Sequence, residues 1–193
     1  MIYLSYIEQF SMVEPQISFE EQLYEVALIM DQWQVAPHEW WCIGEVALKL
    51  GGYEMPWEMP AIDIAVLTEK LDWQSGNTGE RSMLPPAGSM EFETYMRGVT
   101  KIGKGIEVFS AKEIPSQLVS TTVRGREIWY LAPEAQVEFY IHSITRAKQK
   151  EDFFTKHKNR WQLRLDTIWK TAIERNEKSV AEIAERLIKE LNK

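Results

Sequence analysis

The chain has 193 residues, 45% of them hydrophobic, which is enough for one domain with a sizeable core. Its formal net charge of −7 argues against general nucleic-acid binding, which needs a basic surface. The single cysteine, Cys42, excludes an intrachain disulfide and fits a reducing cytoplasm. No apolar run approaches the roughly 20 residues of a membrane helix, and residues 1–15 lack the basic region of a signal peptide. We therefore expect a cytoplasmic protein without membrane partners.

Residues 1–17 form an ambiguous N-terminal segment, in which Ile2, Tyr6 and Phe10 are spaced as one face of a helix. The first clear signal follows it. Ser18 and Glu21 have the spacing of a capping box and predict a helix that ends before Pro37.

Residues 40–52 form the central stretch of the sequence. The apolar run 40–43 predicts a short strand that bends at Gly44, and Val46, Ala47 and Leu50 then follow helical spacing. The pair Gly51-Gly52 ends this short helix. The connection that follows carries Trp57, and it is either an ordinary surface loop or part of a ligand site.

The run 61–67 predicts a strand, because Ile62, Ile64 and Val66 are β-branched residues at a period of two. Asp63 and Ala65 then lie on the opposite face. A lone acid in an apolar strand is costly to bury unless it has a partner. Asp63 is therefore the sharpest chemical signal in the chain.

Two hairpins are expected after this strand. The first covers residues 90–111 and turns near Lys104-Gly105, with Glu107 and Phe109 on the opposite face from Ile106 and Val108. The second covers residues 120–131. Between the central strand and the first hairpin, residues 74–89 predict a long loop without regular structure, in which Arg81 could reach an anionic ligand.

The last third of the chain is predicted to be helical from Pro133 onward, because proline and Glu134 favour a first turn. Residues 146–164 are rich in basic side chains, of which Lys148 and Lys150 could contact phosphates or simply form a solvated face. Ser179 and Glu182 predict a second capping box. The final helices would either cover the domain or form an interface between copies of the chain.

The layout of residues 40–67 resembles the nucleotidyltransferase superfamily, in particular the small bacterial enzymes that adenylylate aminoglycosides and lincosamides. That family has a Gly-Gly or Gly-Ser turn opening a short helix, and then an Asp-x-Asp strand. Here Gly44-Glu45 matches the turn and Ala61-Ile62-Asp63 matches the strand, with Glu45 and Ala61 as departures.

The resemblance implies an α/β (α+β) fold with a small mixed sheet, flanking helices and a C-terminal helical part, divided as residues 1–17, 18–132 and 133–193. It implies Asp63 and Glu107 as catalytic carboxylates and ligands of Mg²⁺. Glu45 could replace the lost first carboxylate as a third ligand. The residues expected to bind the nucleotide are Gly44, Glu45, Lys148 and Lys150.

Two functions are the main hypotheses, and a toxin- or antitoxin-type module that acts through the C-terminal helices is a third, less favoured interpretation. The first is a divergent member with impaired or lost catalysis that binds a small ligand or a partner in the cleft. The alternative is an active enzyme that uses Mg²⁺ to transfer a nucleotide from an NTP to a hydroxyl of a small acceptor. The loss of a carboxylate at Ala61 and the negative charge of Glu45 favour the first. A homo-oligomer formed through the terminal helices is a further expectation.

Overall fold

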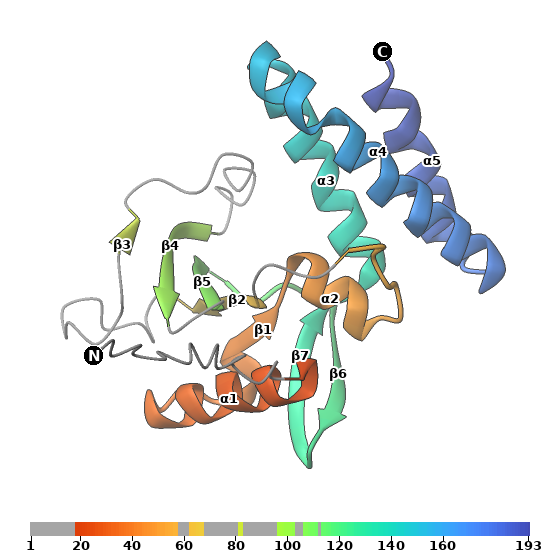
Figure 1. Cartoon of the computed structure of the whole chain (residues 1–193). Helices are drawn as coiled ribbons and strands as arrows, with labels where there is room; N and C mark the ends of the chain where they lie inside the picture. The colour runs from red at the N-terminus through yellow and green to blue at the C-terminus, as the bar shows by residue number, and fades with distance from the viewer. Residues whose placement is uncertain (1–17, 58–61, 68–80, 83–95, 103–105, 112) are drawn as a thin grey trace, which may run out of the picture.

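The computed structural model describes residues 18–57, 62–67, 81–82, 96–102, 106–111 and 113–193. Within them a mixed β-sheet carries helices and is followed by a C-terminal helical part, so the predicted fold class is confirmed (Figure 1). The helices are α1 (Phe19–Gln32), α2 (Gly44–Leu50), α3 (Pro133–Lys148), α4 (Glu151–Glu174) and α5 (Lys178–Leu191), with a 3₁₀ turn at Pro37–Glu39. The strands are β1 (Trp40–Cys42), β2 (Ile62–Leu67), β3 (Arg81–Ser82), β4 (Met96–Ile102), β5 (Ile106–Ala111), β6 (Leu118–Val123) and β7 (Arg126–Leu131).

The strands lie in the order β3-β4-β5-β2-β1-β7-β6. β2 is parallel to β5 and antiparallel to β1, and β1 is parallel to β7. The two predicted hairpins are present as β4–β5 and β6–β7, both antiparallel. The central strands β1, β2 and β5 therefore come from separate parts of the chain. The last residue of β1 and the first residues of β2 and β5 lie at the same end of these strands.

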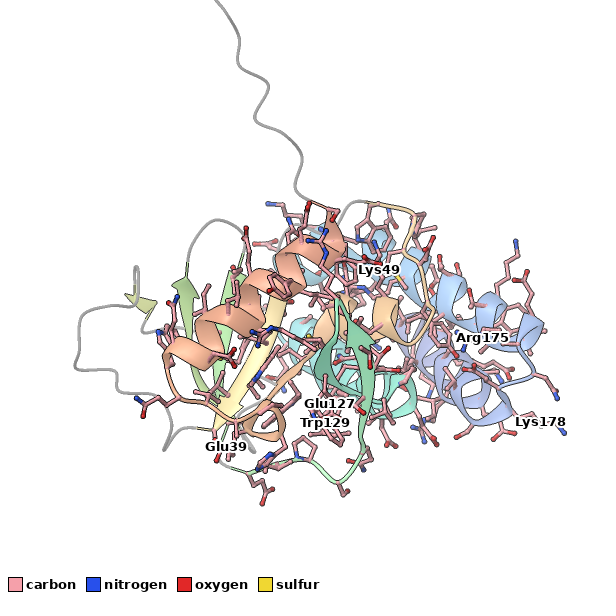
Figure 2. All side chains as sticks on the ribbon, turned by 90° about the horizontal axis from the view of Figure 1, so that it is seen from below. Glu39, Lys49, Glu127, Trp129, Arg175 and Lys178 are labelled. Carbon is pink, nitrogen blue, oxygen red and sulfur yellow. The ribbon has the colours of Figure 1, made fainter. Side chains whose placement is uncertain are left out.

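The two faces of the sheet follow the predicted alternation. Ile62, Ile64 and Val66 lie in one buried cluster with the apolar side of α1, whereas Ala65 and Phe109 belong to a second cluster on the opposite face. Figure 2, seen from below, shows α1 lying across the strands. Asp63 and Glu107 thus occupy the face away from α1.

The C-terminal helices have a core of their own. α3, α4 and α5 lie side by side beyond the end of the sheet (Figure 1), and their buried residues include Ile144, Leu165, Ile168 and Leu187. Leu48 of α2 and Tyr53 after it belong to this same cluster. The bundle is therefore anchored to the sheet through the short helix α2.

Two predicted features are wrong. Ser179 does not cap a helix, because α5 already begins at Lys178, and the Ser179 hydroxyl instead donates to the Glu134 carboxylate of α3. The region 74–89 is not wholly without regular structure, since Arg81 and Ser82 pair with Thr100 and Val99 of β4. The remaining residues of that region, like Ala61, lie outside the described residues.

Candidate functional site

The turn between β1 and α2 is built on Gly44, as the sequence predicts. Its φ is +64°, a left-handed conformation that L side chains rarely adopt, and a Cβ here would lie 2.9 Å from Asp63 Oδ2. The Gly44 N–H donates to Gln136 Oε1 of α3 at 2.8 Å. Glycine is therefore required here because the Asp63 carboxylate lies against the turn.

Asp63 and Glu107 stand side by side, because β2 and β5 pair in parallel with these two residues in register. Burial, and then the charges of Glu107 and Glu45, raise the pKa of Asp63 from 3.8 to about 7, while Arg164 opposes the rise. The structure thus brings the two predicted catalytic carboxylates together and makes Asp63 a group that titrates near neutrality.

Glu45 has basic and hydrogen-bonding partners. Its carboxylate accepts a hydrogen bond from Trp57 Nε1 at 2.9 Å and another from the Arg164 guanidinium of α4. Arg160 lies one helical turn earlier, with its Nη2 at 3.6 Å from Glu45 Oε1. Only 9% of Glu45 is exposed. The negative charge expected to repel a phosphate is instead neutralised by the protein.

The residue that sequence reasoning missed is Arg164. It lay within a region of many basic residues, and nothing in its local pattern separated it from them. It is 119 positions away from Glu45 along the chain, and only the packing of α4 beside α2 and α3 brings the two together. Trp57, left open between a loop residue and a site residue, belongs to this same group of contacts.

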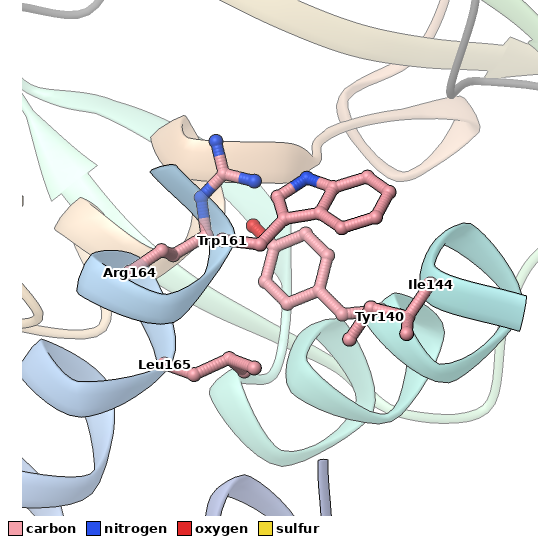
Figure 3. A pocket seen from close by; sticks show the side chains of 5 residues that line it. All are labelled: Tyr140, Ile144, Trp161, Arg164 and Leu165. Carbon is pink, nitrogen blue, oxygen red and sulfur yellow. The ribbon is translucent and has the colours of Figure 1, made fainter. Parts of the chain in front are cut away.

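A small cavity lies beside Arg164, between α3 and α4. Its lining includes Tyr140, Ile144, Trp161 and Leu165, which project toward one another in Figure 3. Its volume of about 10 Å³ is room for roughly one water molecule. Arg164 Nε, on the lining of this cavity, is buried without a hydrogen-bond partner in the structure.

The two lysines predicted to contact phosphates lie elsewhere. Lys148 ends α3, and its ammonium group contacts the backbone and the carboxylate of Glu190 on α5. It lies twelve positions after Gln136 in the same helix, a distance of about 18 Å along the axis. Lys150 is exposed between α3 and α4. The structure does not bring either lysine to Asp63.

The described residues contain no group of three His, Cys, Asp or Glu side chains that could hold a metal ion, so the site of Asp63, Glu107 and Glu45 stays a prediction. The pair of Asp63 and Glu107 still offers hard oxygen ligands of the kind that Mg²⁺ takes, and Mg²⁺ commonly uses only one or two protein carboxylates. The pair therefore fits one ion, whereas Glu45 is held by arginine.

Comparisons with known proteins add no relative. No protein-family model, curated protein or solved structure matches the chain. None of the helices that the structure describes is long and apolar enough to cross a membrane.

Proposed function

We propose that this chain is a divergent nucleotidyltransferase-fold protein with impaired or lost catalysis, which binds a small ligand or a partner beside Asp63 and Glu107. The observation that carries the proposal is the pairing of Glu45 with Arg164. In the enzymes that the chain resembles, the turn that matches Gly44-Glu45 would bind the phosphates. Here an ion pair of the chain itself occupies it, and both side chains are largely buried, with relative exposures of 11% and 13%.

The second support is the backbone of the same turn. An N–H that would contact a phosphate must be free to donate, yet the Gly44 N–H already donates to Gln136. A nucleotide phosphate would have to displace the Gln136 side chain from the Gly44 N–H. To bind Arg164, it would also have to separate this side chain from the buried Glu45. Breaking such a pair by removing one member costs about 3–5 kcal/mol in other proteins. Both contacts disfavour a triphosphate in this position.

The alternative is an active transferase that uses Mg²⁺, and one observation favours it. Asp63 and Glu107 are in register on neighbouring strands, and the raised pKa of Asp63 reflects in part the negative charge of Glu107 beside it. A divalent ion between the two carboxylates would relieve this repulsion. When bound, the ion would stabilise charge on a transferring phosphoryl group, and the chain would hold it through Asp63 and Glu107.

Calorimetric titration with ATP and with GTP, each with and without Mg²⁺, separates the two functions. We expect no binding by the wild type and a gain of binding in Glu45→Ser, which releases Arg164 for a phosphate. The matched control is Glu182→Ser, an exposed glutamate on α5. Binding by the wild type that requires Mg²⁺ and is lost in Asp63→Asn would contradict the proposal and support the active enzyme. If Glu45→Ser also fails to bind, the blocked turn is not the reason, and the nucleotide part of the proposal falls.

The cytoplasmic location is part of this proposal, since it rests on the single buried Cys42. The homo-oligomer expected through the terminal helices remains a prediction.

A further inference from the structure

β6 is the last of the described strands at one end of the sheet. It pairs with β7 on one side, and no strand among the described residues pairs with the other side (Figure 1). Its six residues, Leu-Val-Ser-Thr-Thr-Val, contain no charged residue and no proline. Natural edge strands are commonly protected by such residues, because an open edge is a template for another strand.

The hairpin register shows which backbone groups are available. Val123 pairs with Arg126 across a two-residue turn, and the Ala132 N–H donates to the Gln117 carbonyl further along. In an antiparallel ladder the bonded pairs alternate, so the odd-numbered residues of β6 direct their N–H and C=O groups at β7. The same groups of Leu118, Ser120 and Thr122 therefore point away from the sheet.

We propose that two copies of this chain pair through β6, antiparallel, with Thr121 opposite the partner's Thr121. In this register Ser120 faces the partner's Thr122, so the outward N–H and C=O groups of both strands meet as hydrogen-bonded pairs. Val119 faces the partner's Val123. From Val119 to Val123, like residues then face like residues and none of them is charged, and such β-branched and threonine pairs stabilise sheets.

The order Val-Ser-Thr-Thr-Val is what selects a second copy as the occupant. It reads nearly the same in both directions around Thr121, as a junction with two-fold symmetry requires. Val119, which is 38% exposed, would be covered by the partner. The pairing is independent of the site at Asp63, since β6 lies three strands from β2 in the sheet.

Disulfide trapping tests the register directly. In Thr121→Cys the two new cysteines face each other at a position where neighbouring strands are closest, within the span of a disulfide. We expect mild oxidation to shift the chain from 22.6 kDa to a linked dimer of twice that mass. The native Cys42 is buried and gives no background.

Val119→Cys is the matched control on the same strand and face. In the proposed register its two cysteines are offset by four residues, about 13 Å, and cannot join. If exposure alone decided the linking, random collision would favour Val119→Cys, because Val119 is exposed and Thr121 is only partly so. Linking of Thr121→Cys alone supports the proposal. Equal or greater linking of Val119→Cys, or of Ser120→Cys, overturns it.

A proline variant tests the hydrogen bonds. Adding Ser120→Pro to Thr121→Cys removes an outward N–H without touching the bonds to β7, and we expect loss of the linked dimer. Ser120→Ala keeps the N–H and should preserve the link. Far-UV circular dichroism confirms that each variant is folded. A linked dimer that survives Ser120→Pro in a folded chain overturns the proposal.

Discussion

Gly44 meets two constraints that a side chain would violate. Its φ of +64° strains any L residue, and a Cβ would lie 2.9 Å from Asp63 Oδ2. We expect Gly44→Ala to lower the free energy of unfolding by about 2–3 kcal/mol, measured by urea denaturation. Gly125→Ala is the control, because its φ is +80° but nothing lies within 4 Å of the added Cβ. Equal losses in the two variants would show that contact with Asp63 costs nothing.

Asp63 makes stability depend on pH. Burial and the neighbouring carboxylates raise its folded pKa to about 7, whereas the unfolded chain ionises near 3.8. Between these two pKa values the folded state retains a proton that the unfolded state loses. The contribution of Asp63 to the free energy of unfolding is therefore fully present below about pH 4 and is lost as the pH rises to 7. Each pKa unit corresponds to about 1.4 kcal/mol, so the loss is at most about 4 kcal/mol.

We expect Asp63→Asn to flatten the fall in unfolding free energy between pH 4.5 and pH 8, since the amide does not titrate. Urea denaturation at both pH values measures it, with the exposed Asp152→Asn as the matched control. A variant with the same pH dependence as the wild type would mean that Asp63 is ionised throughout this range.

At the scale of elements, Glu45 of α2 forms an ion pair with Arg164 of α4 and a longer one with Arg160 of the same helix. Arg164→Met leaves Glu45 buried with Trp57 and the more distant Arg160, and we expect a loss of about 3 kcal/mol in unfolding free energy. Adding Glu45→Gln should restore part of it, as a double-mutant cycle would show. Arg186→Ala, which removes an exposed pair with Glu138, should cost less than about 1 kcal/mol. Similar losses in the two single variants would show that the pair of Glu45 and Arg164 has no special weight.

The two predicted capping boxes had different outcomes. At Ser18 the reciprocal bonds with Glu21 are both present, whereas Ser179 lies inside α5. We expect Ser18→Ala to destabilise the chain by about 1 kcal/mol in thermal or urea unfolding, through loss of the cap. Ser179→Ala should cost clearly less, because it removes only an exposed contact with Glu134. The reverse order would contradict this assignment of the helix starts.

Local pattern predicted most of the elements but only half of the site. The two-residue period of β2 and the turn at Gly44 are encoded within a few residues, and the period correctly placed Asp63 on the face opposite Ile62, Ile64 and Val66. The partner of Glu45 is not encoded locally. It depends on where α4 packs, and the same local rules treated Lys148 and Arg164 alike. Long-range ion pairs of this kind are decided by tertiary packing, which a single sequence does not display.

At the scale of the whole molecule, the predicted boundary at residue 133 runs through shared cores. Leu48 and Tyr53, from the first part, are fully buried among residues of α3, α4 and α5. Ala47 and Leu131 pack with Ala135 of α3. Separating the two parts would expose these side chains, and each large one contributes about 1.5–3 kcal/mol when buried. The sum is comparable with the whole stability of a typical domain, about 5–15 kcal/mol.

We therefore expect that fragments 18–132 and 133–193 do not fold as independent units. Each fragment alone should show poor dispersion in amide NMR spectra and no cooperative urea transition, while the full chain unfolds in one transition by both tryptophan fluorescence and far-UV circular dichroism. Mixing the fragments should recover part of the native signal, because each fragment supplies the apolar surface that the other fragment packs against. A cooperative transition in the isolated 18–132 fragment would contradict this and would mean that the sheet and α1 are stable without the bundle.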